Sequence, residues 1–303
     1  MKITQVLNLS NDDYHNSEEY KDYWSSSNLK NYIVSPREAL YQKTKEKDAP
    51  SPQMVFGSQI HDFLASKHIR GQKFEWNVFE PPINPTTKEP YGKISKAYQD
   101  AILRVNNPIS SNDMELIHDI WDMIRNSGYG WYFEQNIISK GIAEASYFVD
   151  AGIHKFKYRP DVLTENIIFD YKTINKSQFN EHGIAYVIKD RGYDISASMY
   201  QDFEHERTGI WKPFYIVWIM KEPPFDVLIH DISDRCFETF GKNEVIVNNG
   251  AMTWRKIRDQ HELCQTSNQW PGYANKFDCF NGARIKQSSL GFDNYFDNFE
   301  IDD

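Results

Sequence analysis

The sequence predicts an α/β or α+β protein in which one mixed β-sheet is flanked by helices. Three observations point to this fold class. Apolar residues recur at helical spacing in the first part of the chain, short apolar segments separated by turn residues fill the middle, and two more such segments follow a further helical stretch. With 303 residues, 40% of them hydrophobic and 25% charged, the chain can bury a sizeable core.

The first 130 residues are predicted to be mostly helical. The stretches behind this prediction are residues 1–50, which are polar and contain a serine-rich capping cluster, residues 54–67 and residues 111–126. Residues 80–92 are rich in proline, threonine and glycine, so we expect an exposed loop there.

The middle of the chain is predicted to form strands. Residues 143–149, 154–162 and 167–172 are separated by short turn segments, which indicates three consecutive strands. The later elements that we expect are a helix over residues 193–207, strands over 214–220 and 225–231, and a helix over 233–264.

Charge, cysteine content and hydropathy limit the class of protein. The net charge of −9 argues weakly against nucleic-acid binding, although a basic channel can lie inside an acidic surface. Three widely spaced cysteines argue against a disulfide framework and for a reducing cytosol. Neither a secretory signal nor an apolar stretch long enough to span a bilayer is visible, so we expect a cytoplasmic protein without a membrane partner.

The segment with the clearest chemistry joins two of the predicted strands. Asp161 ends one strand, and Asp170 and Lys172 lie on the next. Because side chains alternate along a strand, Asp170 and Lys172 point to one face and Tyr171 to the other, while a hairpin would place Asp161 beside them. Two carboxylates can hold a hard cation such as Mg²⁺, with Mn²⁺ as a substitute. A nearby lysine can stabilise the charge that develops on an attacked phosphodiester.

This pattern has an ordinary alternative, because an aspartate two residues from a lysine on a strand is most often an exposed ion pair. Two features favour a catalytic interpretation. Residues 167–169 are strongly apolar, so Asp170 would end a buried strand, where an unpaired carboxylate is costly. A second acid, Asp161, also follows a basic residue and a proline at hairpin distance.

The same residues resemble a known family. The runs Tyr158-Arg159-Pro160-Asp161 and Asp170-Tyr171-Lys172-Thr173 are similar to the core motif of the PD-(D/E)XK nucleases. Within that superfamily they resemble the RecB-like branch and the exonuclease VIII (RecE-type) exodeoxyribonucleases of phages and prophages. The run from Gly57 to His61 is similar to the GxxxH helix of this family, and Glu144 to its strand glutamate.

The resemblance covers nearly the whole chain and implies one nuclease domain over residues 1–303 with a restriction-endonuclease-like core. That domain would consist of a helical N-terminal part over about residues 1–130, a catalytic core over about 131–232, and a C-terminal helix with an acidic-aromatic tail over about 233–303.

The resemblance also implies roles for individual residues. Asp170 would be the central metal ligand, Asp161 a second, and His61 would complete the shell. Lys172 would be the catalytic lysine, and the backbone carbonyl of Tyr171 would face the metal.

Glu144 would be a further catalytic residue, at a second metal or in the outer shell. Without the resemblance, Glu144 on a strand would be interpreted as solvent-facing, and a lone His61 on an amphipathic helix as structural or solvated.

The contacts to DNA are implied less specifically. The family usually has Gln-x-x-x-Tyr on the helix after the core. Here Tyr200 matches the tyrosine, but Ser196 stands at the glutamine position and is too short for the same reach. Arg159 and Lys157 fall on one face of a predicted strand and could meet phosphate. Equally, Tyr200 could be a core aromatic and the basic residues ordinary surface groups.

The activity implied by the resemblance is that of a metal-dependent DNA exonuclease, bacterial or phage-encoded, that degrades one strand from the ends of linear duplex DNA in the 5′→3′ direction. A homo-oligomer and a role in homologous recombination beside a single-strand annealing protein are implied as well. Two alternatives stay open. One is an endonuclease or nickase on the same core, and the other is a non-catalytic DNA- or partner-binding module on a decayed nuclease fold.

Overall fold

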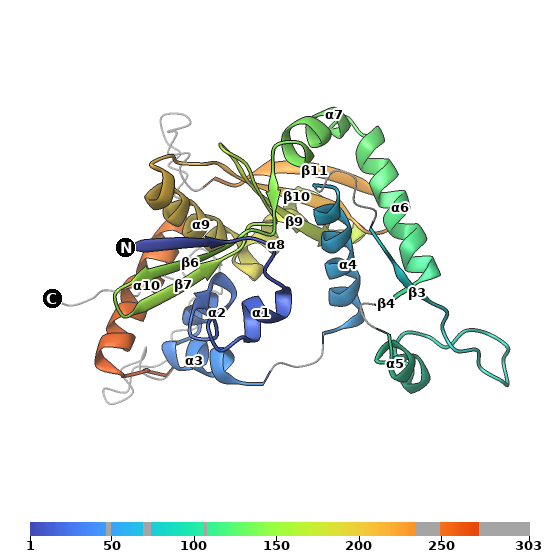
Figure 1. Cartoon of the computed structure of the whole chain (residues 1–303), viewed down its shortest axis with the longest axis horizontal. Helices are drawn as coiled ribbons and strands as arrows, with labels where there is room; N and C mark the ends of the chain where they lie inside the picture. Colours follow the sequence, from blue (N-terminus) through green and yellow to red (C-terminus); the bar gives the residue numbers. More distant parts are fainter. Residues whose placement is uncertain (47–49, 69–73, 106–107, 234–248, 273–303) are drawn as a thin grey trace.

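Two mixed β-sheets form the centre of the protein, whose computed structural model describes residues 1–46, 50–68, 74–105, 108–233 and 249–272 (Figure 1). The first sheet has the order β1 (Lys2–Val6), β6 (Ser146–Ala151), β7 (His154–Tyr158), β2 (Trp24–Ser25). The second has the order β11 (Asp226–Asp231), β10 (Phe214–Met220), β9 (Ile168–Ile174), β8 (Val162–Leu163), β5 (Ile142–Ala143). Each combines parallel and antiparallel pairs, and helices flank both, so the predicted fold class is confirmed.

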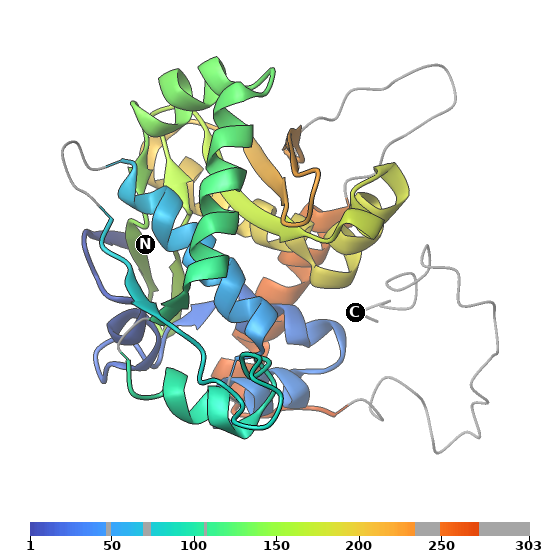
Figure 2. The same cartoon turned by 90° about the vertical axis from the view of Figure 1, so that its right-hand side faces the viewer.

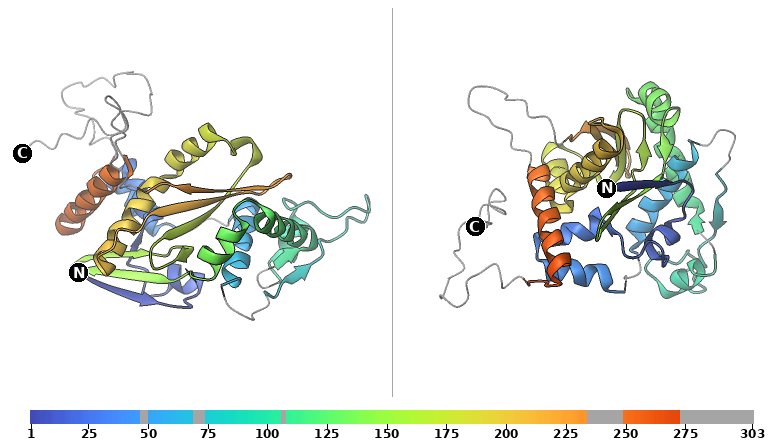
Figure 3. Two further views of the ribbon diagram at one scale, coloured as in Figure 1. Left: turned by 90° about the horizontal axis from the view of Figure 1, so that it is seen from above. Right: turned by 60° about the vertical axis from the view of Figure 1, so that its left-hand side comes forward.

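The single sheet expected from the sequence is divided in two at residues 159–161. The strand predicted over residues 154–162 ends at Tyr158, and the chain enters the second sheet only at Val162. Pro160 lies at this break and has no backbone N–H to give to a ladder. The strands β7 and β8 therefore belong to different sheets. Figure 3 shows β1 and the β6–β7 hairpin as a layer beside the strands of the second sheet.

The N-terminal part is only partly helical. The helices in its first 50 residues are α1 (Asn11–Asn16), α2 (Ser26–Leu29), the 3₁₀ turn η1 (Lys30–Ile33) and α3 (Pro36–Thr44). The helical prediction is wrong for β1, which pairs antiparallel with β6 from Lys2↔Asp150 to Val6↔Ser146. No local pattern reveals this pairing, because its partners are far apart along the chain.

Helices α4 (Pro52–Ser66) and α6 (Ser111–Asn126) confirm the two amphipathic helices predicted there and lie together on one side of the molecule (Figure 2). Each begins at a serine whose hydroxyl accepts a hydrogen bond from a first-turn N–H, Ser51 for α4 and Ser110 for α6. Their apolar residues form one buried cluster with the second sheet, including Ile60, Phe63, Ile117, Ile120, Tyr171 and Val217.

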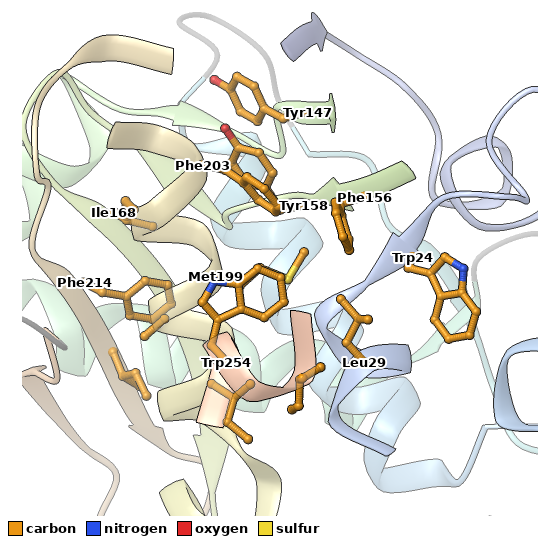
Figure 4. Packing of buried hydrophobic residues seen from close by; sticks show 14 of the residues in the cluster. Trp24, Leu29, Tyr147, Phe156, Tyr158, Ile168, Met199, Phe203, Phe214 and Trp254 are labelled. Atoms are coloured by element: carbon orange, nitrogen blue, oxygen red, sulfur yellow. The ribbon is translucent and has the colours of Figure 1, made fainter. Parts of the chain in front are cut away.

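A larger core lies on the other side of the second sheet, under α9 (Tyr193–Thr208) and α10 (Asn249–Ser267). Figure 4 shows its large side chains in contact, among them Trp24, Leu29, Phe156, Tyr158, Met199, Phe203 and Trp254. Burying a side chain of this size stabilises the fold by about 1.5–3 kcal/mol. The helix predicted over residues 193–207 is confirmed. The one predicted over residues 233–264 is confirmed from Asn249, since residues 234–248 lie outside the described part.

The remaining described elements are β3 (Asn77–Phe79), α5 (Lys96–Ile102), β4 (Pro108–Ser110), α7 (Gly130–Tyr132), η2 (Phe133–Ile138), η3 (Lys176–Gln178) and α8 (Glu181–Arg191). Residues 80–92 form the predicted loop, closed by one bridge between Ile83 and Pro90. The predicted acidic-aromatic tail lies outside the described residues. No helix within the described ranges has the length and apolar character needed to cross a membrane.

Candidate active site

A cleft of about 810 Å³ brings the predicted catalytic residues together. Its lining residues come from β9 and from α1, α2, α4 and α8. Figure 1 labels these elements. The short strand β8 pairs only with Ile168 and Phe169, so among the described strands none covers this edge of β9 from Asp170 onward. The cleft follows that open edge as far as Asn175.

Strand β9 supplies the two residues at the centre of the cleft. Asp170 and Lys172 both line it and form an ion pair with each other. Tyr171 points the other way, into the cluster beneath α4, where its ring stacks on Phe133 at 6.0 Å. This is the alternation expected of a strand. The Tyr171 carbonyl, predicted to face a metal, accepts a hydrogen bond of 3.2 Å from the Lys172 ammonium and so lies on the cleft side.

Asp161 is held against the open edge of β9. Its Oδ2 accepts a hydrogen bond of 2.5 Å from the N–H of Tyr171, and its Oδ1 lies 3.5 Å from Nδ1 of His61. Asp161 thus stands beside the strand that carries Asp170, as the hairpin prediction required.

His61 reaches the cleft from α4. The neighbouring residues Ile60 and Phe63 are buried in the core, which fixes the helix rotation and leaves His61 at the cleft wall. The helix approaches β9 closely at Gly57, where an added Cβ would lie 3.3 Å from Oγ1 of Thr173. The ring of His61 meets that of Tyr171 edge-on, with centroids 5.9 Å apart.

Glu144 lines the cleft, but the expectation that it lies on a strand is wrong. It sits between β5 and β6 with φ 53°, in the left-handed region that a side chain with a Cβ rarely adopts. Its N–H donates to the carbonyl of Asp161 at 3.1 Å. This turn brings one ligand atom each of Glu144, Asp161 and His61 within 4.8 Å of one another.

The residues present fit a divalent cation. One imidazole nitrogen and carboxylate oxygens from three acidic residues converge on the cleft, and hard cations such as Mg²⁺ and Mn²⁺ favour oxygen ligands. The ligand atoms of His61, Glu144 and Asp161 lie close enough together to hold the ion, and Asp170 lines the same cleft.

The carboxyl groups of this cluster have pKa values displaced in opposite directions. Burial raises the pKa of Asp161, but the charges of His61 and Lys172 outweigh it and hold that pKa at about 2. Burial and the Asp161 charge raise the pKa of Glu144 to about 8. The pKa of Asp170 is also raised, mainly by burial, although Lys172 opposes the change. The positive groups nearby therefore do not balance the three carboxyl groups of Asp161, Glu144 and Asp170. A bound cation would supply the missing positive charge.

The acidic groups also raise the pKa values of His61 and Lys172. Burial lowers the pKa of His61, but the Asp161 carboxylate outweighs burial and the net shift is upward. Burial also opposes the charge of Lys172, but Asp170 and Asp161 raise its pKa well above the ordinary value, so it stays an ammonium at neutral pH.

Two of the four predicted DNA contacts are not in the cleft. Lys157 is 2% exposed, and its ammonium donates to the carbonyls of Tyr14 and Tyr20, so the prediction of a phosphate contact is wrong. Ser196 is absent from the cleft lining, and its hydroxyl donates to the Gly192 carbonyl at 3.4 Å within its own helix.

The other two predicted contacts do line the cleft. Tyr200 is partly buried, and its hydroxyl lies 3.5 Å from the backbone carbonyl of Arg159. The guanidinium of Arg159 is turned toward protein acceptors rather than the open cleft.

Sequence reasoning missed several lining residues. Lys221, Arg191 and Tyr193 gave no signal, because single residues after a strand or at a helix end fit no motif. Asn11 and Tyr14 also line the cleft, and no motif in the sequence assigns either of them a role.

Comparison with known proteins identifies the family. The family described as "PDDEXK-like domain of unknown function (DUF3799)" matches residues 25–283, which is most of the chain. The protein belongs to this family. A solved structure from Eubacterium rectale, described as a "putative exonuclease", has a similar fold with a TM-score of 0.53. It is 14% identical, over 96% of this chain and 99% of that one. No curated protein matches the sequence.

The family match and the fold comparison both indicate a PDDEXK-like protein. The protein has a PDDEXK-like nuclease fold, and the predicted superfamily is confirmed. The low identity to the Eubacterium rectale protein means that this likeness shows the shared fold and carries no residue roles.

Proposed function

We propose that the protein is a divalent-metal-dependent DNA exonuclease that hydrolyses phosphodiester bonds from the ends of linear duplex DNA. One observation carries the proposal. The acids Asp161 and Asp170 and the ammonium of Lys172 meet in one cleft of a PDDEXK-like fold, with His61 and Glu144 beside them.

The chemistry divides between the cation and the side chains. A bound Mg²⁺ or Mn²⁺ would neutralise the phosphodiester and lower the pKa of a coordinated water. Lys172 places a permanent positive charge beside Asp170, where it can hold a phosphate oxygen and stabilise the charge that develops during attack. The Tyr193 ring lies 5.1 Å from the Lys172 ammonium and limits the positions that this ammonium can take.

The far end of the cleft suits the backbone of a DNA strand. Lys221 follows β10 directly, and its N–H donates to the Ile174 carbonyl at 3.2 Å, which anchors it at the carboxyl end of β9. Arg191 and the first turn of α4, capped by Ser51, line the same cleft. From His61 to Ser51 the helix rises about 15 Å, so phosphates a few nucleotides from the cleaved bond would meet positive charge.

The finer parts of the proposal rest on the resemblance to RecE-type enzymes. They are the 5′→3′ direction, a homo-oligomer, action in phage-type homologous recombination beside a single-strand annealing protein, and a cytoplasmic location. The description of the Eubacterium rectale protein as an exonuclease agrees with cleavage from ends.

Digestion of linear duplex DNA labelled at one 5′ end tests the proposal. With Mg²⁺, the wild type should release the label as mononucleotide, whereas Lys172→Met, Asp170→Asn and an EDTA control should not. Lys176→Met is the matched control, because the Lys176 ammonium lies outside the cleft and donates to the carbonyl of Pro223.

The substrates also separate the alternatives. Cutting of closed circular DNA would replace the exonuclease with an endonuclease or nickase. A wild type that binds linear, nicked and single-stranded DNA but cuts none of them with Mg²⁺ or Mn²⁺ would leave only a binding module.

A further inference from the structure

The side chain of Arg159 is only 7% exposed although it borders the cleft, and it makes a dense set of contacts to protein. Its Nε donates to Oγ of Ser146 at 2.8 Å, its Nη1 to Oδ1 of Asn11 at 2.7 Å, and its Nη2 to the Leu9 carbonyl at 3.1 Å. A guanidinium presents its donors in a rigid planar fork, so three acceptors from separate segments fix its orientation.

The remaining contacts of Arg159 face the cation site. Its Nη1 lies 3.8 Å from Oε2 of Glu144, and its planar group stacks over the Tyr14 ring at 4.1 Å. Glu144 is placed beside Asp161, whose negative charge repels it. Arg159 and His61 are the positive groups that offset this repulsion, and Arg159 has the larger effect.

Arg159 also anchors the N-terminal wall of the cleft. The wall includes Asn11 and Tyr14 of α1, a helix of only six residues that depends on tertiary contacts for its position. Arg159 holds this segment through Leu9 and Asn11, and Lys157 holds it through the Tyr14 carbonyl. The two basic residues that the sequence assigned to DNA both face this segment.

We propose that Arg159 is a positioning residue, which holds the Glu144 carboxylate at the cation site and ties the segment of residues 9–14 to it. Arg159 does not contact DNA phosphate. This inference rests on the proposed function only in that Glu144 serves the cation.

The first test measures Mn²⁺ binding to the full chain by calorimetry, so no nuclease assay is needed. Arg159→Met keeps the apolar stem and removes every donor. We expect it to weaken Mn²⁺ binding by about 10–100-fold, the usual effect of losing a group that orients a ligand. Glu144→Gln should cause a similar loss, and the double variant should bind no more weakly than Glu144→Gln alone.

Matched variants separate positioning from a general effect on folding. Lys176→Met removes an ammonium that lies outside the cleft, so its Mn²⁺ affinity should equal that of the wild type. Arg159→Lys keeps the charge but cannot bridge three acceptors, and it should restore part of the affinity. If Arg159→Met does not fold, Arg159→Lys in the same cycle with Glu144→Gln replaces it.

A second measurement addresses DNA directly. The salt dependence of binding to duplex DNA, measured in EDTA, should have the same slope for Arg159→Met as for the wild type. A phosphate contact would instead lower the slope by about one.

These measurements test the proposed function and the role of Arg159 separately. A wild type that binds no Mn²⁺ would overturn the proposed function and this inference together. Equal Mn²⁺ affinity of wild type and Arg159→Met, additive losses in the double variant, or a reduced salt slope would overturn the role of Arg159 while the proposed function stands.

Discussion

Two clusters of charged side chains in this protein, one buried and one partly exposed in the cleft, are built on opposite principles. In the first, Glu204 of α9 is 0% exposed and completely paired. The donors to its two oxygens are Tyr158 at 2.7 Å, Arg207 at 2.9 and 2.7 Å, and Lys212 at 2.9 Å. In the second, the cleft holds Glu144, Asp161 and Asp170 against one imidazole and the ammonium of Lys172, with Arg159 at a longer distance from Glu144.

The pKa values of Glu204 and Glu144 are shifted in opposite directions for this reason. Burial raises the pKa of Glu204, but the hydrogen bonds from Arg207 and Tyr158 outweigh burial and the pKa ends below its ordinary value. The pKa of Glu144 rises to about 8, because burial and Asp161 act together and Arg159 offsets them only in part. A cluster whose charges are balanced by the protein itself stabilises the fold. A cluster left with excess negative charge is suited to bind a cation.

The largest expected effect comes from breaking the balanced cluster. Glu204→Gln leaves the buried ammonium of Lys212 without its counter-charge and removes the partner of the partly exposed Arg207, so we expect a loss of about 3–5 kcal/mol in the free energy of unfolding. Urea denaturation measures this, and Mn²⁺ affinity of the folded variant should be unchanged. A loss smaller than about 0.5 kcal/mol would show that the pairing of Glu204 contributes little.

Removal of the Lys172 ammonium from the cleft should lower the reaction rate instead of the stability. Lys172→Met is expected to lower kcat about 10²–10³-fold, the usual effect of removing a group that stabilises developing charge. Mn²⁺ affinity should not fall, because the ammonium repels the ion. Single-turnover digestion with saturating Mn²⁺ measures the rate. A variant with wild-type kcat would exclude Lys172 from catalysis.

The raised pKa of Glu144 makes the metal-free protein sensitive to pH. The folded state keeps the proton that the unfolded state releases near its ordinary pKa of 4.5. The contribution of Glu144 to stability is therefore full below pH 4.5 and falls until the pH passes about 8. Asp161, with its pKa lowered from 3.8 to about 2, acts only below this window.

Thermal melting in EDTA between pH 5 and 8 checks this. Glu144→Gln should make the change of Tm with rising pH less negative than in the wild type. The raised pKa values of Asp170 and His61 act in the same direction as that of Glu144, and the lowered pKa values of His68, His230 and His261 act against it. Saturating Mn²⁺ should raise Tm most at pH 8, where the carboxyl groups no longer need to lose protons. An equal change of Tm from pH 5 to 8 in the wild type and in Glu144→Gln would contradict the assigned shift.

The smallest expected effect lies at the far end of the cleft. Lys221→Met should lower the salt-dependence slope of DNA binding by about one, with a modest loss of affinity. Lys176→Met should leave the slope unchanged, because its ammonium lies outside the cleft. Equal slopes for both variants would mean that the strand takes another path.

The sequence by itself determined the centre of the candidate site. The alternation of a strand places Asp170 and Lys172 on one face and Tyr171 on the other, and a short hairpin brings Asp161 to their side. These are local relations, set by a repeat of two residues and by turns of a few residues. The same holds for the helix that carries His61, because its apolar face follows from its own spacing.

The tertiary structure decided how the rest of the chain meets this centre. The pairing of β1 with β6 joins the two ends of the first 150 residues, and it places the segment after β1 over Lys157 and Arg159. Two cations that looked free for DNA are thereby committed to protein. Glu144 likewise gains its position from a turn between the two sheets. Contacts between residues so far apart depend on which surfaces meet when the chain packs, and a local pattern in the sequence carries no record of that.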